Sequence, residues 1–259
     1  MGLAIAHGIL KKKLYSKADI IFIENKKERI NSLRKQGFII LDDLKIAIKK
    51  YLKNLDVILV AVKPQDIDTV LLELKNIVDK NTVIVSIAAG IKIRRITSKL
   101  NKNQPITRVM PNTPSQVGEG MSAITYNKTV SRKQKDLISR IFSSVGKTLE
   151  INESKFDLVG AVNGSGPAYF CYLIESLITT AIELGLNEQA AERLVLQTAY
   201  GTSYLLSKGT ITPEALRKSA TSRKGITEAA LKVFEKKKFK KIIFEAVKTA
   251  KNRSIELGK

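Results

Sequence analysis

The chain has 259 residues, of which 44% are hydrophobic and 27% charged, a composition typical of one large or two modest globular domains. No apolar run reaches the roughly 18 residues that suggest a membrane-spanning helix. Lysine and arginine number 45 against 24 acidic residues, a formal net charge of +21, which is compatible with a nucleic-acid partner, with anionic small molecules or with solvated lysine-rich faces. We favour solvated faces, because the basic residues are spread along the chain without a helix-turn-helix, zinc-finger or aromatic stacking motif.

The first residues and the single cysteine bear on location. Met1 to Leu14 has too short an apolar stretch for a signal peptide and no small-residue cleavage site after it. Cys171 cannot form an internal disulfide, which fits a reducing compartment, so we expect a cytoplasmic protein. Cys171 lies in an apolar run and is expected to pack in the core. Because His7 is the only histidine, neither histidine catalysis nor a metal cluster is expected.

Up to about Ile151, short β-branched runs alternate with helical stretches. The runs predict buried parallel strands of a βα architecture, at residues 19–24, 56–62, 82–87, 106–109, 122–126 and 148–151.

Two helix starts are predicted between these strands. Asn25 with Glu28 and Ser131 with Gln134 have the capping-box spacing. Gly146 is expected to close the second helix.

After Ile151 the strand pattern stops and a helical one begins. Apolar and small residues from Gly166 onward share one helical face, namely Tyr169, Tyr172, Leu173, Ser176, Leu177 and Thr180. Asn187 and Thr212-Pro213 predict two further helix starts, and residues 163–167 predict a break between helices. Helices this apolar in about 100 residues cannot bury their faces alone, so we expect a homo-oligomer interface here.

Three turns follow predicted strands at the end where ligands bind to parallel sheets. They are residues 61–65 (AVKPQ), 86–91 (SIAAGI) and 108–114 (RVMPNTP). Taken singly, each turn is a weak indication of a nucleotide site.

In this order, followed by residues 164–169 (GSGPAY), the turns resemble the pyrroline-5-carboxylate reductase family. The resemblance continues through residues 118–120, 197–201, 213–217 and 221–227, and so covers almost the whole chain. It implies an α/β Rossmann-type dinucleotide-binding domain over residues 1–151, without its first strand, and an all-α domain over residues 152–259 for substrate binding and dimerisation. The implied reaction is hydride transfer from NAD(P)H to 1-pyrroline-5-carboxylate, which gives L-proline in the last step of proline biosynthesis.

The resemblance also implies the site residues. Backbone N–H groups of Gly225 and Ile226 would bind the substrate carboxylate, Thr227 would be catalytic through a hydrogen bond to the ring nitrogen, and Ser222 and Ser165 would contact substrate. Without the resemblance, Thr227 would be interpreted as an ordinary N-cap. The implied cofactor-binding residues are Met1, Gly2, Asn25, Lys26, Ala61, Val62, Lys63, Pro64, Ala88, Ala89, Met110, Pro111, Asn112, Gly164 and Gly166.

The choice of cofactor depends on the end of the first predicted strand. Glu24 could accept a hydrogen bond from a ribose 2′-hydroxyl, which favours NAD. Asn25, Lys26, Lys27 and Arg29 could instead bind the 2′-phosphate of NADP. The family more often has Asn-Arg where Asn25-Lys26 stand, so we favour NADP.

The chain departs from the family pattern in two places. The family begins with a strand and a turn ending in Gly-Asn-Met-Gly, whereas this chain starts at Met1-Gly2, so we hypothesise that the displayed start lies inside the true reading frame. In the substrate loop, Thr-Ser-Pro-Gly-Gly-Thr-Thr is replaced by residues 221–227 (TSRKGIT). If the replaced glycine needs a positive φ, Lys224 is strained by roughly 1–2 kcal/mol; its charge beside a carboxylate substrate could offset this.

Two alternatives stay open. A related imine or β-hydroxyacid dehydrogenase is one, although the hydroxyacid enzymes place a catalytic lysine on the long helix after the linker and residues 169–185 contain none. The other is a non-catalytic basic binding protein derived from a decayed reductase, which the missing turn and Lys224 would suit.

Overall fold

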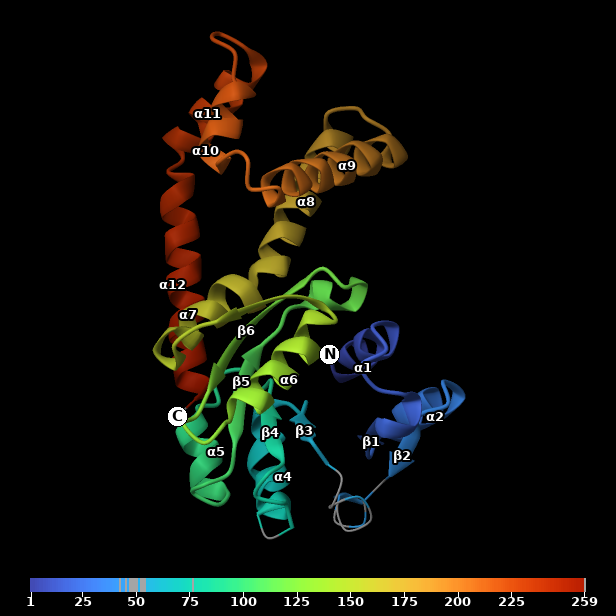
Figure 1. Cartoon of the computed structure of the whole chain (residues 1–259). Helices are drawn as coiled ribbons and strands as arrows, with labels where there is room; N and C mark the ends of the chain where they lie inside the picture. The colour runs from blue at the N-terminus through green and yellow to red at the C-terminus, as the bar shows by residue number, and fades with distance from the viewer. Residues whose placement is uncertain (42, 45, 47–50, 52–54, 76, 259) are drawn as a thin grey trace. The chain divides into compact units, whose positions relative to one another are not determined.

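The computed structural model describes residues 1–41, 43–44, 46, 51, 55–75 and 77–258. Two compact units are formed, which we describe separately (Figure 1). Unit 1 comprises Met1–Ser165 and Ala250–Lys259, and unit 2 comprises Gly166–Thr249. The domain division between residues 151 and 152 falls inside unit 1 and stays a prediction.

A five-stranded sheet forms the centre of unit 1. Its order is β3 (Val57–Val60), β4 (Val83–Ser86), β5 (Ile106–Met110), β6 (Gly120–Tyr126) and β7 (Gly146–Glu150). Each lies within or over a predicted strand. Parallel pairing was expected throughout, but β5 and β6 are antiparallel. The physical reason is the connection, since only the short η4 turn (Thr113–Val117) joins them and a parallel return needs a long crossover.

A second, two-stranded sheet pairs β1 (Ile21–Ile23) with β2 (Ile39–Leu41) in parallel. Strand β2 was not predicted, because periodicity alone does not distinguish its run of four apolar residues, 38–41, from a helix segment. Helix α1 (Gly2–Lys11) contacts both sheets: Ile5 joins the core over β4, and Ala6 packs with Phe38 beside β2. Helix α1 therefore holds the two sheets in one unit.

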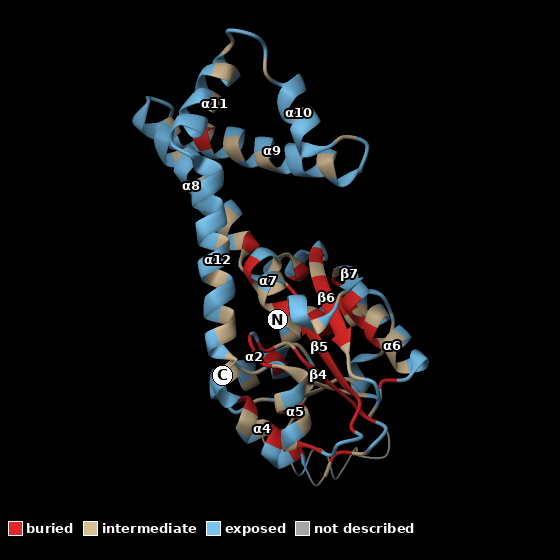
Figure 2. Cartoon of the chain, turned by 90° about the vertical axis from the view of Figure 1, so that its left-hand side faces the viewer, coloured by how far each residue is buried: buried red, intermediate tan, exposed pale blue. Residues whose placement is uncertain are grey.

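Helices cover both faces of the large sheet. Helices α4 (Ile67–Leu74) and α5 (Ile93–Lys99) pack on one face with Ile84, while α1 and α6 (Arg132–Ser143) pack on the other with Val83 and Val85. This alternation along β4 is the two-residue period of a strand buried on both sides. The buried residues of Figure 2 concentrate in this layered part of unit 1.

The helix starts and ends predicted in unit 1 are confirmed in part. The capping box of Ser131 and Gln134 is confirmed, with hydrogen bonds of 3.3 and 2.8 Å. The Asn25 cap is wrong: helix α2 (Lys27–Lys35) has no side-chain cap from Asn25. Gly146 does not close α6, which ends at Ser143; Gly146 opens β7 with φ +147°.

Unit 2 is entirely helical. It contains α8 (Gly166–Glu183), α9 (Glu188–Ser207), α10 (Pro213–Ser219), α11 (Ile226–Lys236) and the part of α12 (Phe239–Leu257) that precedes residue 250. The predicted caps are confirmed, because Asn187 and Thr212 accept the backbone N–H groups of Ala190 and Ala215.

Within residues 166–249, all of which the structure describes, only Gly166 and Ala191 are buried. The predicted apolar face of α8 is exposed, with Tyr172 at 73% and Leu177 at 47%. Cys171 is exposed as well, so its expected core position is wrong. The reason is that α8 meets no core of its own chain at that face.

Candidate functional site

In unit 1, the start of α1 lies against the turn after β3. A Cβ added to Gly2 would be 3.5 Å from the Cβ of Ala61. The first N–H groups of a helix have no partner within it, and the helix dipole makes this end attractive to anions. The structure thus brings the predicted cofactor residues Met1, Gly2 and Ala61 together.

The turn after β1 contains the acidic and the basic residues that bear on the choice between NAD and NADP. The Glu24 carboxylate accepts the N–H groups of Asn25 and Lys26, each at 3.0 Å, and lies 3.4 Å from Arg29. Its side chain is only 18% exposed. The side chains of Asn25, Lys26 and Lys27 are exposed. The acid is therefore engaged inside the turn, while the basic side chains are open to an anion.

The turns after β3 and β4 expose some predicted residues and bury others. Lys63 is exposed and precedes the short η3 turn (Pro64–Asp66), whose first residue is Pro64. Val62 is partly buried against the core. Ala88 is 3% exposed, so its methyl group packs inside and only its backbone could meet a ligand. Ala89 beside it is exposed.

Two asparagines join the ends of β5 and β6. Asn112 accepts the N–H of Met121 at 2.9 Å and donates to the amide oxygen of Asn163 at 3.1 Å. Asn163 donates in turn to the carbonyl oxygens of Met110 and Met121, at 2.9 and 3.0 Å. We call Asn112 and Asn163 the asparagine bridge. It fixes the predicted turn of Met110, Pro111 and Asn112, and it occupies the Asn112 side chain.

Asn163 belongs to a π-helical turn, Gly160–Gly164, that connects α7 (Phe156–Val159) to α8 through Ser165. The break predicted for residues 163–167 is thus limited to Ser165, and π-turns are frequent at functional sites. A Cβ on Gly164 would be 3.4 Å from the Met110 sulfur, so glycine permits close packing of this turn on the end of β5. Gly166 is buried at the start of α8.

The hydrogen bonds of Asn163 were not predicted from the sequence, where Asn163 was interpreted as the start of a break between helices whose small residues would lie against the cofactor and substrate. Its partners Met110 and Met121 lie far away in the chain, and no local spacing indicates them.

A buried arginine on β5 contacts the segment that leads into this π-helical turn. Arg108 on β5 is 1% exposed, donates to Glu153 at 3.2 Å and lies over the Phe156 ring at 4.8 Å. Burial lowers the pKa of Arg108, and the Glu153 carboxylate opposes that shift. Glu153 also accepts the N–H of Ile93 at 2.7 Å, so this ion pair ties β5 to the start of α5.

In unit 2, the predicted substrate loop precedes α11. The Gly225 N–H donates to the Ser222 carbonyl at 3.0 Å, and a Cβ on Gly225 would overlap the Ser222 hydroxyl. The donors without an intrahelical partner are consequently the N–H groups of Ile226, Thr227 and Glu228, the first three helical residues. Ile226 is 92% exposed, and Thr227 is exposed too.

Lys224 has φ +60°, the left-handed conformation that favours glycine. The positive φ on which the predicted backbone strain of Lys224 depended is therefore present. Its N–H donates to the Glu228 carboxylate at 2.7 Å.

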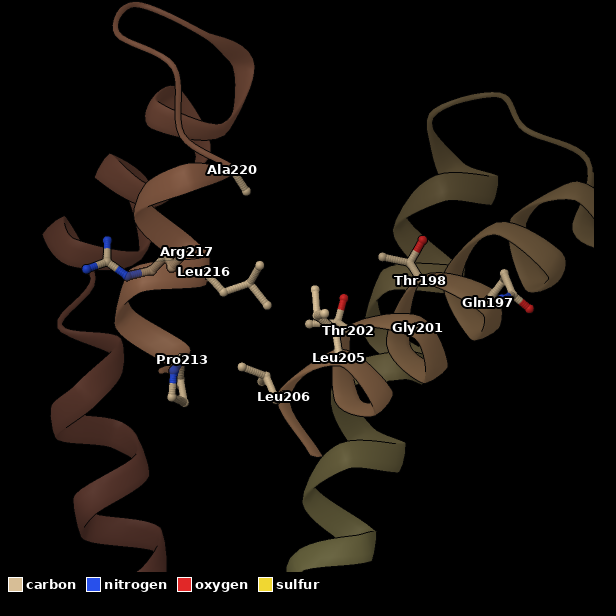
Figure 3. Close-up of a pocket in the computed structure, with 10 residues that line it drawn as sticks. All are labelled: Gln197, Thr198, Gly201, Thr202, Leu205, Leu206, Pro213, Leu216, Arg217 and Ala220. Carbon is tan, nitrogen blue, oxygen red and sulfur yellow. The ribbon is translucent and has the colours of Figure 1, made fainter. Parts of the chain in front are cut away.

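A groove of about 490 Å³ runs between α9 and α10 within unit 2. Figure 3 shows Leu216 of α10 directed toward α9, and Leu206 directed toward α10. Its lining is mostly apolar and consists of Gln197, Thr198, Gly201, Thr202, Leu205, Leu206, Pro213, Leu216, Arg217 and Ala220.

Two negative findings hold for the described part of the chain. No group of three or more histidines, cysteines and acidic residues is placed to hold a metal ion. None of its helices combines the length and apolarity needed to cross a membrane.

Two family models match the chain. Residues 1–90 match a model described as NADP oxidoreductase coenzyme F420-dependent, and residues 153–257 match one described as pyrroline-5-carboxylate reductase dimerisation.

Curated relatives and solved structures agree with these matches. A pyrroline-5-carboxylate reductase of Synechocystis is 42% identical over 79% of this chain and 76% of its own length. One of Mycobacterium tuberculosis is 32% identical over 99% of this chain and 93% of its own. The reductase structure from Coxiella burnetii has a TM-score of 0.90 and 32% identity, and that from Plasmodium falciparum, with NADP bound, has 0.89 and 31%. Both structural matches cover 100% of this chain and 95% of the other.

Proposed function

The chain belongs to the pyrroline-5-carboxylate reductase family, and we propose on that basis that it reduces 1-pyrroline-5-carboxylate to L-proline by hydride transfer, as the last step of proline biosynthesis. The observation that carries the proposal is that relatives of this activity match both units, from the start of α1 to the end of α12. The absence of a lysine from α8 is the feature that sets the chain apart from hydroxyacid dehydrogenases.

NADP is the cofactor, as the NADP-bound relative and the NADP oxidoreductase family model support. The donor set fits it, because the start of α1 is suited to a phosphate and exposed Asn25, Lys26 and Lys27 are suited to a 2′-phosphate. Bound NADPH supplies the hydride. We propose further contacts from residues 61–64, Ala89 and the backbone of Ala88, and from the Met110–Asn112 turn and Gly164, with Gly166 and Ser165 beside them.

The substrate side of the proposal lies in the loop before α11. The N–H groups of Ile226 and Thr227 would bind the substrate carboxylate at the positive end of the helix. Gly225 and Ser222 would shape the loop, because a Cβ at residue 225 would overlap the Ser222 hydroxyl. The Thr227 hydroxyl, which has no hydrogen-bond partner among the described residues, would donate to the ring nitrogen where charge changes as the amine forms.

The test is an assay of 1-pyrroline-5-carboxylate reduction with NADPH and with NADH. Removing the Thr227 hydroxyl in Thr227→Val should lower kcat/KM by roughly a hundredfold, the lower range of general acid–base effects. Thr227→Ser keeps the hydroxyl and should retain most activity. Equal activity of Thr227→Val and the unchanged protein would contradict the assigned role, and a preference for NADH would contradict the 2′-phosphate contacts.

We also propose that unit 2 pairs with a second copy of the chain, as a homodimer or a larger assembly. The match to a dimerisation model over residues 153–257 and the exposed apolar helices of unit 2 support this. The groove between α9 and α10 (Figure 3) is the surface that we assign to the other copy. The single cysteine supports a reducing compartment such as the cytoplasm.

A further inference from the structure

The loop before α11 departs from its family at Lys224, and its contacts indicate how a lysine is accommodated there. Lys224 has φ +60°, a conformation in which a side chain crowds the following carbonyl oxygen. Its backbone N–H is bonded to the Oε2 atom of Glu228 at 2.7 Å, a short charge-assisted hydrogen bond. The other carboxylate oxygen of Glu228 lies 3.5 Å from the Lys232 ammonium group.

Glu228 is the third residue of α11, one turn after the loop. A glutamate at this place can bend back to a backbone N–H before the helix, as it does in a capping box. Here it reaches the residue before the N-cap, so the carboxylate holds the backbone of Lys224. The side chain of Glu228 is 32% exposed.

We infer that Glu228 is a positioning residue, required because Lys224 replaces glycine: its carboxylate holds the left-handed backbone of Lys224 and thereby presents the N–H groups of Ile226 and Thr227 to the substrate carboxylate. The inference rests on the proposed function for its effect on substrate. The contact between Glu228 and Lys224 does not depend on that function.

Charge supports the assignment. An acid alone at this place would repel an anionic substrate, but Lys224 and Glu228 together add no net charge to the loop. The helix start therefore keeps its attraction for an anion. An alternative explanation is that the Lys224 ammonium group contacts the substrate directly. That alternative assigns no role to the Glu228 carboxylate, whereas the hydrogen bond to the Lys224 backbone does.

The experiment is a double-mutant cycle in the full chain with Glu228→Ala, Lys224→Gly and both changes together. If the hydrogen bond matters only while residue 224 is a lysine, Glu228→Ala should raise KM for 1-pyrroline-5-carboxylate about tenfold in the Lys224 background, with a smaller change in kcat. In the Lys224→Gly background the same change should alter KM by less than about twofold. An equal effect of Glu228→Ala in both backgrounds would overturn the inference.

Two matched variants separate the hydrogen bond from the charge. Glu228→Gln keeps an oxygen that can accept the Lys224 N–H and should hold KM within about threefold of the unchanged protein. Lys232→Ala removes only the exposed ion pair, which should contribute little. A loss in Lys232→Ala as large as in Glu228→Ala would show that the ion pair, and not the backbone contact, is responsible.

A second readout is independent of catalysis. An arginine-specific protease cleaves after Arg223, a site present in every variant of the cycle, and cleavage requires the loop to open. Glu228→Ala should speed this cleavage about tenfold when residue 224 is lysine and hardly at all when it is glycine. Unchanged cleavage in the lysine background would defeat the inference. If no variant reduces the imine while cleavage behaves as expected, the proposed function fails and the positioning contact stands.

Discussion

The two units of this chain use apolar residues in opposite ways (Figure 2). In unit 1, Phe142 and Phe156 are at most 1% exposed and lie in cores closed by the chain itself. In unit 2, Tyr172 and Phe244 are 73% and 66% exposed. Similar helical patterns in the sequence therefore lead to a self-sufficient core in one unit and to an open surface in the other.

The two units therefore differ in the source of their stability. Burial of apolar surface is the main favourable term in folding, at about 25 cal/mol for each Å² removed from water. Unit 1 obtains this term within one chain. Unit 2 obtains little of it alone, so its stability should depend on a second copy and therefore on protein concentration.

The largest expected effect comes from the groove of unit 2. Leu205→Glu places a charge in the assigned interface, and an unpaired buried charge is strongly destabilising. We expect the oligomer to dissociate to monomers, as measured by sedimentation velocity, with loss of helical circular dichroism on dilution. Lys218→Ala, which removes only an exposed pair with Glu214, should keep the assembled mass. An intact oligomer in Leu205→Glu would place the interface elsewhere.

A substitution in the core of unit 1 should have the next largest effect. Phe142→Ala leaves a cavity in a core that the chain closes itself, and it should cost about 3–5 kcal/mol of unfolding free energy. Denaturant melts at two protein concentrations would measure it. The oligomeric mass should not change. Leu72→Ala on α4, where the side chain is 56% exposed, is the control and should shift stability far less.

A smaller effect is expected at the asparagine bridge. Asn163→Asp replaces the donor to the carbonyl oxygens of Met110 and Met121 with an acceptor and should cost about 1–3 kcal/mol, with a raised KM for NADPH. Thermal melts and initial rates measure both. Asn127 bridges the opposite end of β5, through Ile106 and Gln104. Asn127→Asp should therefore lower stability without changing that KM, and equal KM changes would contradict a specific role for the bridge.

The smallest effect is expected at a hydrogen bond between the segment that follows α1 and the residue that precedes β3. Tyr15 donates to Asp56 at 3.0 Å, and burial together with this bond raises the pKa of Tyr15 from 10.0 to about 12. A raised tyrosine pKa favours the neutral folded form, so the stabilisation is present below pH 10 and is lost as the pH rises toward about 12.

Tyr15→Phe should cost about 0.5–1.5 kcal/mol at neutral pH, the usual range for one hydrogen bond, and should weaken the loss of stability between pH 10 and 12. Urea melts across that range measure it. Tyr126, whose pKa burial also raises to about 12, stays in place and should account for the dependence that remains. An unaltered pH profile in Tyr15→Phe would contradict the assigned bond.

Local signals in the sequence determined much of this protein. The β-branched runs located six strands, and Ser131, Asn187 and Thr212 marked helix starts, because a cap depends on residues three apart. The resemblance to a family with glycine at this position raised the condition of a positive φ at Lys224, and the structure meets that condition.

The tertiary structure alone decided what depends on distant partners. It set the antiparallel return of β6, joined Asn112 to Asn163 and left α8 without a core. Periodicity shows that a face is apolar but not what covers it. The position of an asparagine in the sequence does not show which carbonyl oxygen it will bind. Those contacts join segments that lie far apart in the sequence, and no repeating pattern links such segments. Only the folded arrangement therefore determines them.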